Sequence, residues 1–203
     1  GYGNTDIVQY YYNRVGGSWS GHPMNPPTAL VYNDYSDISF NESNLPIVSY
    51  TKNHIGGGYL YSTISGINNP ADTEDWTNIL IDLDIVITSG IASSSIGVDQ
   101  DNNTWIAYVD EGGEADYISL AKGQNLSFGG SGTWTNNITN SNDGYEPSLA
   151  IVGSDIYLFY EDDNDDIVYD IYHSGQDPPT WEGETTLQTG TYQDVKAKWS
   201  TYN

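Results

Sequence analysis

Short runs of alternating apolar and polar residues, separated by turns rich in Gly, Asn, Asp and Ser, fill this chain. Alternation with a period of two is typical of strands that bury one face, and these turn residues tolerate the positive φ of tight turns. No stretch carries the 3.6-residue period of an amphipathic helix over a useful length. The pattern predicts an all-β chain of short antiparallel strands.

The runs recur in a fixed order. A short alternating run comes first, a more apolar run ending in tyrosine follows, and a third run leads to a segment that carries tryptophan. Aligning the first runs makes four positions equivalent: Asp37, Ser95, Ser148 and Asp194. The order of the runs therefore predicts that each unit folds as a four-stranded antiparallel meander.

Tryptophan marks the same place in each unit, at Trp19, Trp76, Trp134 and Trp181. Successive intervals are 57 (19 to 76), 58 (76 to 134) and 47 (134 to 181) residues. A period of roughly 40–60 residues with several strands per unit is typical of propeller blades. We expect an all-β β-propeller of about four blades, with the tryptophans packed between blades rather than against a ligand.

The two chain ends supply parts of one further unit. Residues 194–203 provide a first strand, and Asp6–Tyr10 resembles the third strand at Asp166–Asp170. A single domain, 1–203, is expected. Its blades are 35–93, 94–145, 146–193, and 194–203 joined with 1–34. Closure of the split blade within one chain, or between chains as a homo-oligomer, both stay open.

The charge balance is strongly acidic, with 28 Asp and Glu against 5 Lys and Arg and a net charge of −23. Nucleic acid and anionic membranes are poor partners for such a surface, because both require basic groups. A solvated acidic surface or a cationic partner fits better. There is no cysteine, so disulfides are excluded, and no apolar run approaches the ~18 residues of a membrane span.

Four sequons for N-glycosylation begin at Asn41, Asn102, Asn125 and Asn137, each in a predicted turn or blade edge. A glycan needs such an exposed position. They favour an extracellular or cell-surface location.

Two units carry a family resemblance. SSIGVDQDNNTWIAYVDEGGEADYISLAKG and PSLAIVGSDIYLFYEDDNDDIVYDIYHSG resemble repeats of secreted sialidase-like, Asp-box-type β-propellers. The resemblance covers the blade pattern and implies an exported carbohydrate-active or surface protein. The run Asp99–Trp105 departs from an Asp-box in spacing and lies between the first two strands. Sialidase chemistry needs several arginines for the substrate carboxylate, and Arg14 is the only one.

Carboxylates on inner strands are the candidates for catalysis. Asp37 and Asp194 start equivalent strands and Glu146 flanks another, so together they could supply the acid and base of a glycoside hydrolase or lyase. The competing interpretation is that these carboxylates bond turn or channel backbone.

Metal binding has its own candidates, because carboxylates at high density suit calcium. EF-hand spacing is missing, and a solvated turn is the alternative. Calcium is the only cofactor that the chain suggests. The candidate ligands are Asp162, Asp163, Asp165, Asp166, Asp99 and Asp101.

These observations favour an extracellular, non-enzymatic propeller module for surface structure or interaction, with glycan or protein binding as its mode. Two alternatives stay open. One is a glycoside-active enzyme that uses the channel carboxylates. The other is a self-assembling structural subunit that closes its split blade between chains.

Overall fold

The computed structural model describes residues 9–15, 18–25, 36–54, 57–68, 70, 73–85, 93–111, 116–130 and 132–190. Throughout this part the chain is all-β with antiparallel pairing, as the alternation predicts. The one helical element in these ranges is a 3₁₀ turn, η1 (Thr73–Asp75). Among the described residues, no helix has the length and apolarity needed to span a membrane.

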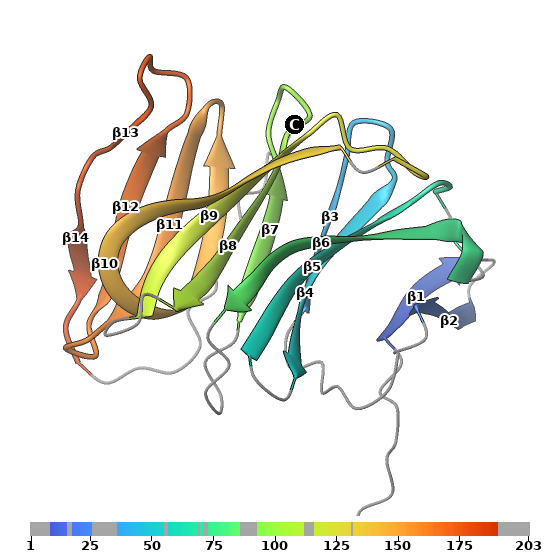
Figure 1. The fold of residues 1–203 in the computed structure, drawn as a ribbon, viewed down its shortest axis with the longest axis horizontal. Coiled ribbons are helices and arrows are strands. Elements are labelled where there is room, and N and C mark those ends of the chain that lie inside the picture. The colour runs from blue at the N-terminus through green and yellow to red at the C-terminus, as the bar shows by residue number, and fades with distance from the viewer. Residues whose placement is uncertain are drawn as a thin grey trace, which may run out of the picture.

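Three antiparallel meanders follow one another along the chain (Figure 1). The first meander consists of β3 (Ser36–Phe40), β4 (Pro46–His54), β5 (Gly57–Ser65) and β6 (Trp76–Ile85).

The second meander pairs β7 (Ser94–Val98), β8 (Thr104–Glu111), β9 (Asp116–Gln124) and the first half of β10 (Thr133–Val152).

The third meander starts with the second half of β10 and continues with two full strands, after which two short strands share the edge of β12. These elements are β11 (Asp155–Asp162), β12 (Ile167–His173), β13 (Thr180–Trp181) and β14 (Thr185–Gln188).

A separate hairpin of β1 (Gln9–Val15) and β2 (Ser18–Asn25) precedes the meanders. β2 contacts η1 and β6, so this hairpin lies beside the first meander (Figure 1). This hairpin is the described part of the predicted split blade, whose residues 1–8, 16–17, 26–34 and 194–203 lie outside the described residues.

β10 differs from the sequence expectation. The predicted boundary between 145 and 146 falls inside this continuous strand of 20 residues, which leaves one meander and enters the next. Pairing shifts near residues 135–138, 139–143 and 145–148, and Asn137 and Glu146 adopt left-handed φ values of 56° and 51°. Such bulges bend and twist a strand without ending it, which is why no loop separates the two meanders.

Tryptophan has the same register in each meander and in the hairpin. It pairs with a residue at or near the end of the preceding strand each time: Arg14 with Trp19, Ser65 with Trp76, Gly123 with Trp134, and Tyr172 with Trp181. The sequence equivalence of the tryptophans is therefore also an equivalence of strand position.

The core lies between the meanders. On β8, Trp105, Ala107 and Val109 pack against the third meander, while Ile106 and Tyr108 pack against the first. Since successive side chains on a strand point to opposite faces, the second meander is buried on both of its faces. β11 instead alternates between buried and half-buried positions, so one face of the third meander is only partly covered.

Replacing Gly144 with Ala tests the tight contact where β10 enters the third meander. A Cβ there would lie 2.5 Å from Cδ2 of the Tyr160 ring and 3.0 Å from the Glu161 carbonyl oxygen. We expect Gly144→Ala to cost about 1–3 kcal/mol in the free energy of unfolding, measured by urea denaturation. Gly130→Ala is the control, because its nearest contact is the rotatable Ser127 hydroxyl. Equal stability of the two variants would contradict this packing.

Candidate functional site

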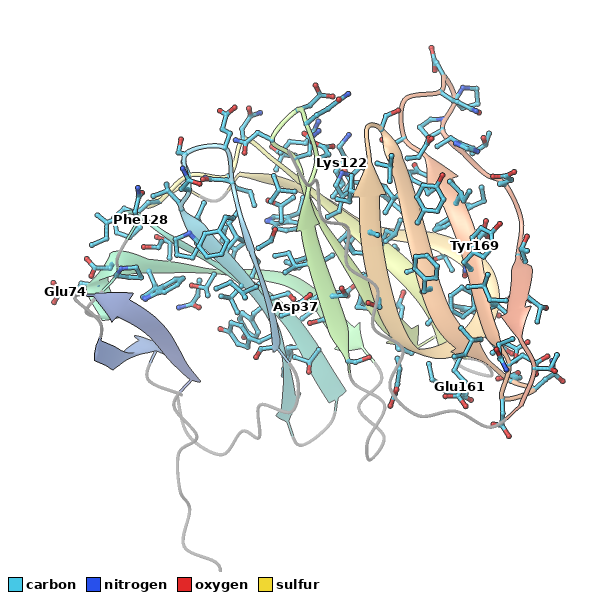
Figure 2. The ribbon with its side chains drawn as sticks, turned by 180° about the vertical axis from the view of Figure 1, so that it is seen from behind. Asp37, Glu74, Lys122, Phe128, Glu161 and Tyr169 are labelled. Carbon is cyan, nitrogen blue, oxygen red and sulfur yellow. The ribbon has the colours of Figure 1, made fainter. Side chains whose placement is uncertain are left out.

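Asp37 lies where the first strands of the first two meanders run side by side, near the middle of the molecule (Figure 2). Its Oδ2 accepts the Ile96 N–H at 3.1 Å and the Ser95 hydroxyl at 3.2 Å. Its Oδ1 accepts the Ile38 N–H at 2.9 Å. The carboxylate therefore joins β3 to β7, as the backbone-bonding interpretation expects.

The same kind of hydrogen bond joins the first strands of the second and third meanders. The Ser95 hydroxyl oxygen accepts the Leu149 N–H at 3.2 Å, so β7 is joined to the second half of β10. Asp37 and Ser95 are equivalent positions, and so are Ile96 and Leu149. In each step, the side-chain oxygen of one first strand accepts a backbone N–H from the next.

Glu146 occupies a different place from Asp37. It sits on the left-handed bulge of β10, and its charge acts on Glu161 of β11. Burial raises the pKa of the Glu161 carboxyl, and negative neighbours add to the rise: Asp165, Glu146 and Asp162. Asp194, the third candidate, lies outside the described residues. Within the described ranges, Glu146 is thus grouped with the acidic turn of the third meander.

Three turns share one geometry, and two of them contain the calcium candidates. In each, the first residue caps the turn with a side-chain oxygen, and the fourth has a left-handed φ: 57° at Asn44, 60° at Asn102 and 60° at Asp165. The backbone N–H of the fourth residue donates to the carbonyl of the first. The three capping residues are Asn41, Asp99 and Asp162.

Asp99 is buried and has both oxygens engaged. Oδ1 accepts the N–H groups of Asp101 (3.0 Å) and Asn103 (2.8 Å), and Oδ2 accepts the indole N–H of Trp105 at 2.8 Å. Trp105 is 1% exposed, so this bond satisfies a donor that water cannot reach.

Asp162 repeats this arrangement. Its Oδ1 accepts the N–H groups of Asn164 and Asp166, each at 2.9 Å, while the neighbouring Asp163 and Asp165 are exposed. Asp101 is exposed on the other turn. Over the described residues, no three His, Cys, Asp or Glu side chains are grouped so as to hold a metal ion. Asp99 and Asp162 thus cap their turns, and Asp166 Oδ1 accepts the Gly190 N–H at 3.0 Å.

The sequon asparagines also have structural roles. Asn41 Oδ1 accepts the N–H groups of Ser43 and Leu45, and Asn102 Oδ1 accepts the Glu42 N–H at 3.1 Å, which joins two turns. Asn137 Oδ1 lies 2.8 Å from the Tyr108 hydroxyl. Asn125 is exposed, with a φ of 55°, after β9.

The tyrosines that close each predicted second run lie inside β4, β8 and β11, and their hydroxyl groups make hydrogen bonds that the sequence analysis did not predict. Tyr50 donates to Asn78 Oδ1 at 3.0 Å within its own meander, and Tyr160 donates to Glu184 Oε2 at 2.8 Å. Tyr160 also accepts from Asn140 of β10 at 3.2 Å. The recurring tyrosine at the end of each apolar run is the signal that could have found these bonds.

Tyr108 bridges two meanders. Its hydroxyl lies 2.9 Å from Asp82 Oδ2 on β6 and 2.8 Å from Asn137 Oδ1 on β10, and it accepts the Asn137 N–H. Burial, followed by the negative charge of Asp82, raises the pKa of Tyr108 far above its ordinary value. The hydroxyl therefore stays protonated, and its hydrogen bonds join β6 to β10 through β8.

Three of the four recurrent tryptophans, Trp76, Trp134 and Trp181, have side chains that the structure describes, and all three pack on neighbouring side chains. Trp76 is buried against Val48, and Trp134 packs on the cluster between the first and second meanders. The Trp181 ring contacts the Tyr172 ring in a tilted arrangement with ring centroids 5.0 Å apart, beside the cluster between the second and third meanders. These positions agree with a packing role.

Comparison of the chain with protein-family models finds no match, and comparison with curated proteins finds none either. The function proposed below therefore depends on the geometry of the described residues.

Substituting Asp99 tests whether its turn is a cap or a calcium site. We expect Asp99→Ala to lower the free energy of unfolding by about 1–3 kcal/mol, because it leaves the buried Trp105 N–H unpaired. Asp101→Ala, on the same turn but exposed, should change it by less than about 0.5 kcal/mol. Urea denaturation with and without a chelator measures both. Equal losses that disappear on chelation would identify a metal site instead.

The raised pKa of Tyr108 predicts that the folded protein loses stability in alkali. Its folded-state pKa is raised above the ordinary value of about 10, so its contribution is complete below pH 10 and is lost as pH rises further. Above pH 10 the wild type should lose about 1.4 kcal/mol per pH unit more than Tyr108→Phe. Tyr157→Phe is the control, because Tyr157 is half-buried and lies on β11 of the third meander. Parallel curves for all three proteins would contradict the assignment.

Proposed function

We propose that this chain is a non-enzymatic β-propeller module that acts outside the cell by recognising a glycan or protein partner. The observation that carries the non-enzymatic part is the engagement of its candidate carboxylates. The catalytic candidate Asp37 has an oxygen atom that accepts a backbone N–H group of the protein itself, and so do the metal candidates Asp99 and Asp162.

Catalysis by paired carboxylates needs one acid and one base or nucleophile around a reacting bond, about 5–9.5 Å apart in glycosidases. Asp37 instead ties two first strands together, and Glu146 lies beside Glu161. The bond between the two first strands favours a structural role for Asp37.

The propeller part of the proposal is supported by three features. The meanders repeat one strand order, their tryptophans share one register, and the second meander is buried on both faces by its neighbours. Sheets that each need a neighbour on both faces are the packing unit of a propeller.

The charge of the protein indicates which kinds of ligand or protein partner suit it. A net charge of −23 with one arginine disfavours anionic ligands and leaves neutral glycans and basic protein surfaces. The four sequons support a place outside the cell. Assembly through the terminal strands remains the second structural possibility.

A paired assay of Asp37→Asn tests the function. The wild-type protein should bind immobilised glycans or basic protein probes and show no turnover of a chromogenic glycoside panel. Asp37→Asn should keep that binding while losing roughly 1 kcal/mol of stability, because an amide replaces one acceptor oxygen with a donor. Asp163→Asn, exposed on its turn, is the matched control. Glycoside turnover that Asp37→Asn abolishes in a folded protein would favour the enzyme.

A further inference from the structure

The side chains of the four sequon asparagines differ in what they bind. Asn41 accepts two N–H groups of its own turn, Asn102 joins two turns, and Asn137 bonds the Tyr108 hydroxyl. Asn125 is exposed, and within the described residues its side chain has no hydrogen-bond partner. Of the four, Asn125 is therefore the asparagine that can carry a large substituent without disturbing a bond of the folded protein.

The hydroxyl residue two positions after each asparagine separates the sequons in the same way. Thr104 is 1% exposed, and the Thr139 hydroxyl bonds a serine hydroxyl on β9 at 3.0 Å. Ser43 is exposed, but the asparagine of its sequon is half-buried. Since the sequon requires the hydroxyl residue, an enzyme that modifies the asparagine must reach both. Both are exposed only in the sequon Asn125–Ser127.

The loop that follows β9 holds Asn125 at the periphery of the molecule. Leu126 packs on the apolar cluster between the first and second meanders, and the Gly129 N–H donates to the Thr77 hydroxyl on β6 at 2.9 Å. Figure 2 shows Phe128, from the same loop, toward one end of the molecule. A bulky group on this loop therefore meets solvent rather than a neighbouring strand.

From these contacts we infer that Asn125 is the N-glycan attachment site of this protein and that the other three sequons stay unmodified. The inference rests on the extracellular location in the proposed function, because N-glycans belong to the surface loops of secreted proteins.

The modification needs a transferring enzyme and a glycosyl diphosphate as the sugar donor. Asn125 Nδ2 forms a bond to the anomeric carbon of the first sugar, and the bond from that carbon to the diphosphate oxygen breaks. The diphosphate leaves with the bonding electrons and takes up the proton that the amide loses. The product is a neutral glycosylated amide, so the net charge of the protein changes only by what the glycan itself carries.

Site occupancy in the full chain tests the inference. The protein is secreted from cells that N-glycosylate their exported proteins, and each sequon peptide is analysed by mass spectrometry before and after enzymatic release of glycans. We expect Asn125 to carry the glycan in most molecules. Ser127→Ala should abolish it, and Ser127→Thr, the matched control, should keep it. An unmodified Asn125, or equal occupancy of all four sequons, overturns the inference.

Thiol labelling tests the same geometry in protein made without glycans. The chain has no cysteine, so Asn125→Cys and Asn102→Cys each introduce a single thiol. Both positions have left-handed backbone, so the two substitutions carry similar strain. Folded Asn125→Cys should react with a bulky maleimide faster than folded Asn102→Cys, because position 102 is half-buried. Equal rates, or a faster reaction at position 102, overturn the inference.

Protein made without glycans also separates this inference from the proposed function. If Asn125 stays unmodified while that protein binds immobilised glycans or basic protein probes, the inference alone fails. If Asn125 is occupied and the protein binds neither class of probe, the proposed recognition fails and the attachment site stands.

Discussion

Burial of both faces of a sheet is the constraint on which the rest of this structure depends. A four-stranded meander whose strands are apolar on both sides cannot be stable alone, because each face exposes aromatic and aliphatic surface to water. β8 meets this constraint by presenting Trp105, Ala107 and Val109 to one neighbour and Ile106 and Tyr108 to the other. The order of the meanders and the position of the core both follow from it.

Apolar packing alone does not fix how neighbouring sheets are placed, since it is not directional. Here the directional contacts are polar and recur between neighbours. The side chains of Asp37 and Ser95 bind the backbone of the next first strand, and Tyr108 links β6 to β10. Buried polar groups that are fully bonded specify one arrangement, whereas unbonded ones would be costly. These bonds therefore set the orientation of meanders that hydrophobic burial brings together.

The strand runs, their order and the repeated tryptophan could be predicted from the sequence, because period-two alternation and turn residues are local signals. The continuity of β10 could not. Its bulges depend on left-handed backbone at Asn137 and Glu146. Asparagine adopts that conformation in several turns of this chain and glutamate rarely adopts it, so neither residue predicts a bulge inside a strand. The partners of Tyr108 could not be predicted either, since Asp82 and Asn137 are brought to it only by the packing of two meanders.

The acidic turns show why residue type alone was ambiguous between a metal site and a cap. Which role a carboxylate takes depends on where its oxygens point, and the left-handed fourth residue of each turn points them at backbone N–H groups. Asn41 performs the same capping in the first meander with a neutral amide. The cap thus requires an acceptor oxygen and not a negative charge. Much of the net charge of −23 is therefore not explained by the needs of the turns, and exposed acids such as Asp101, Asp163 and Asp165 contribute it to the surface instead.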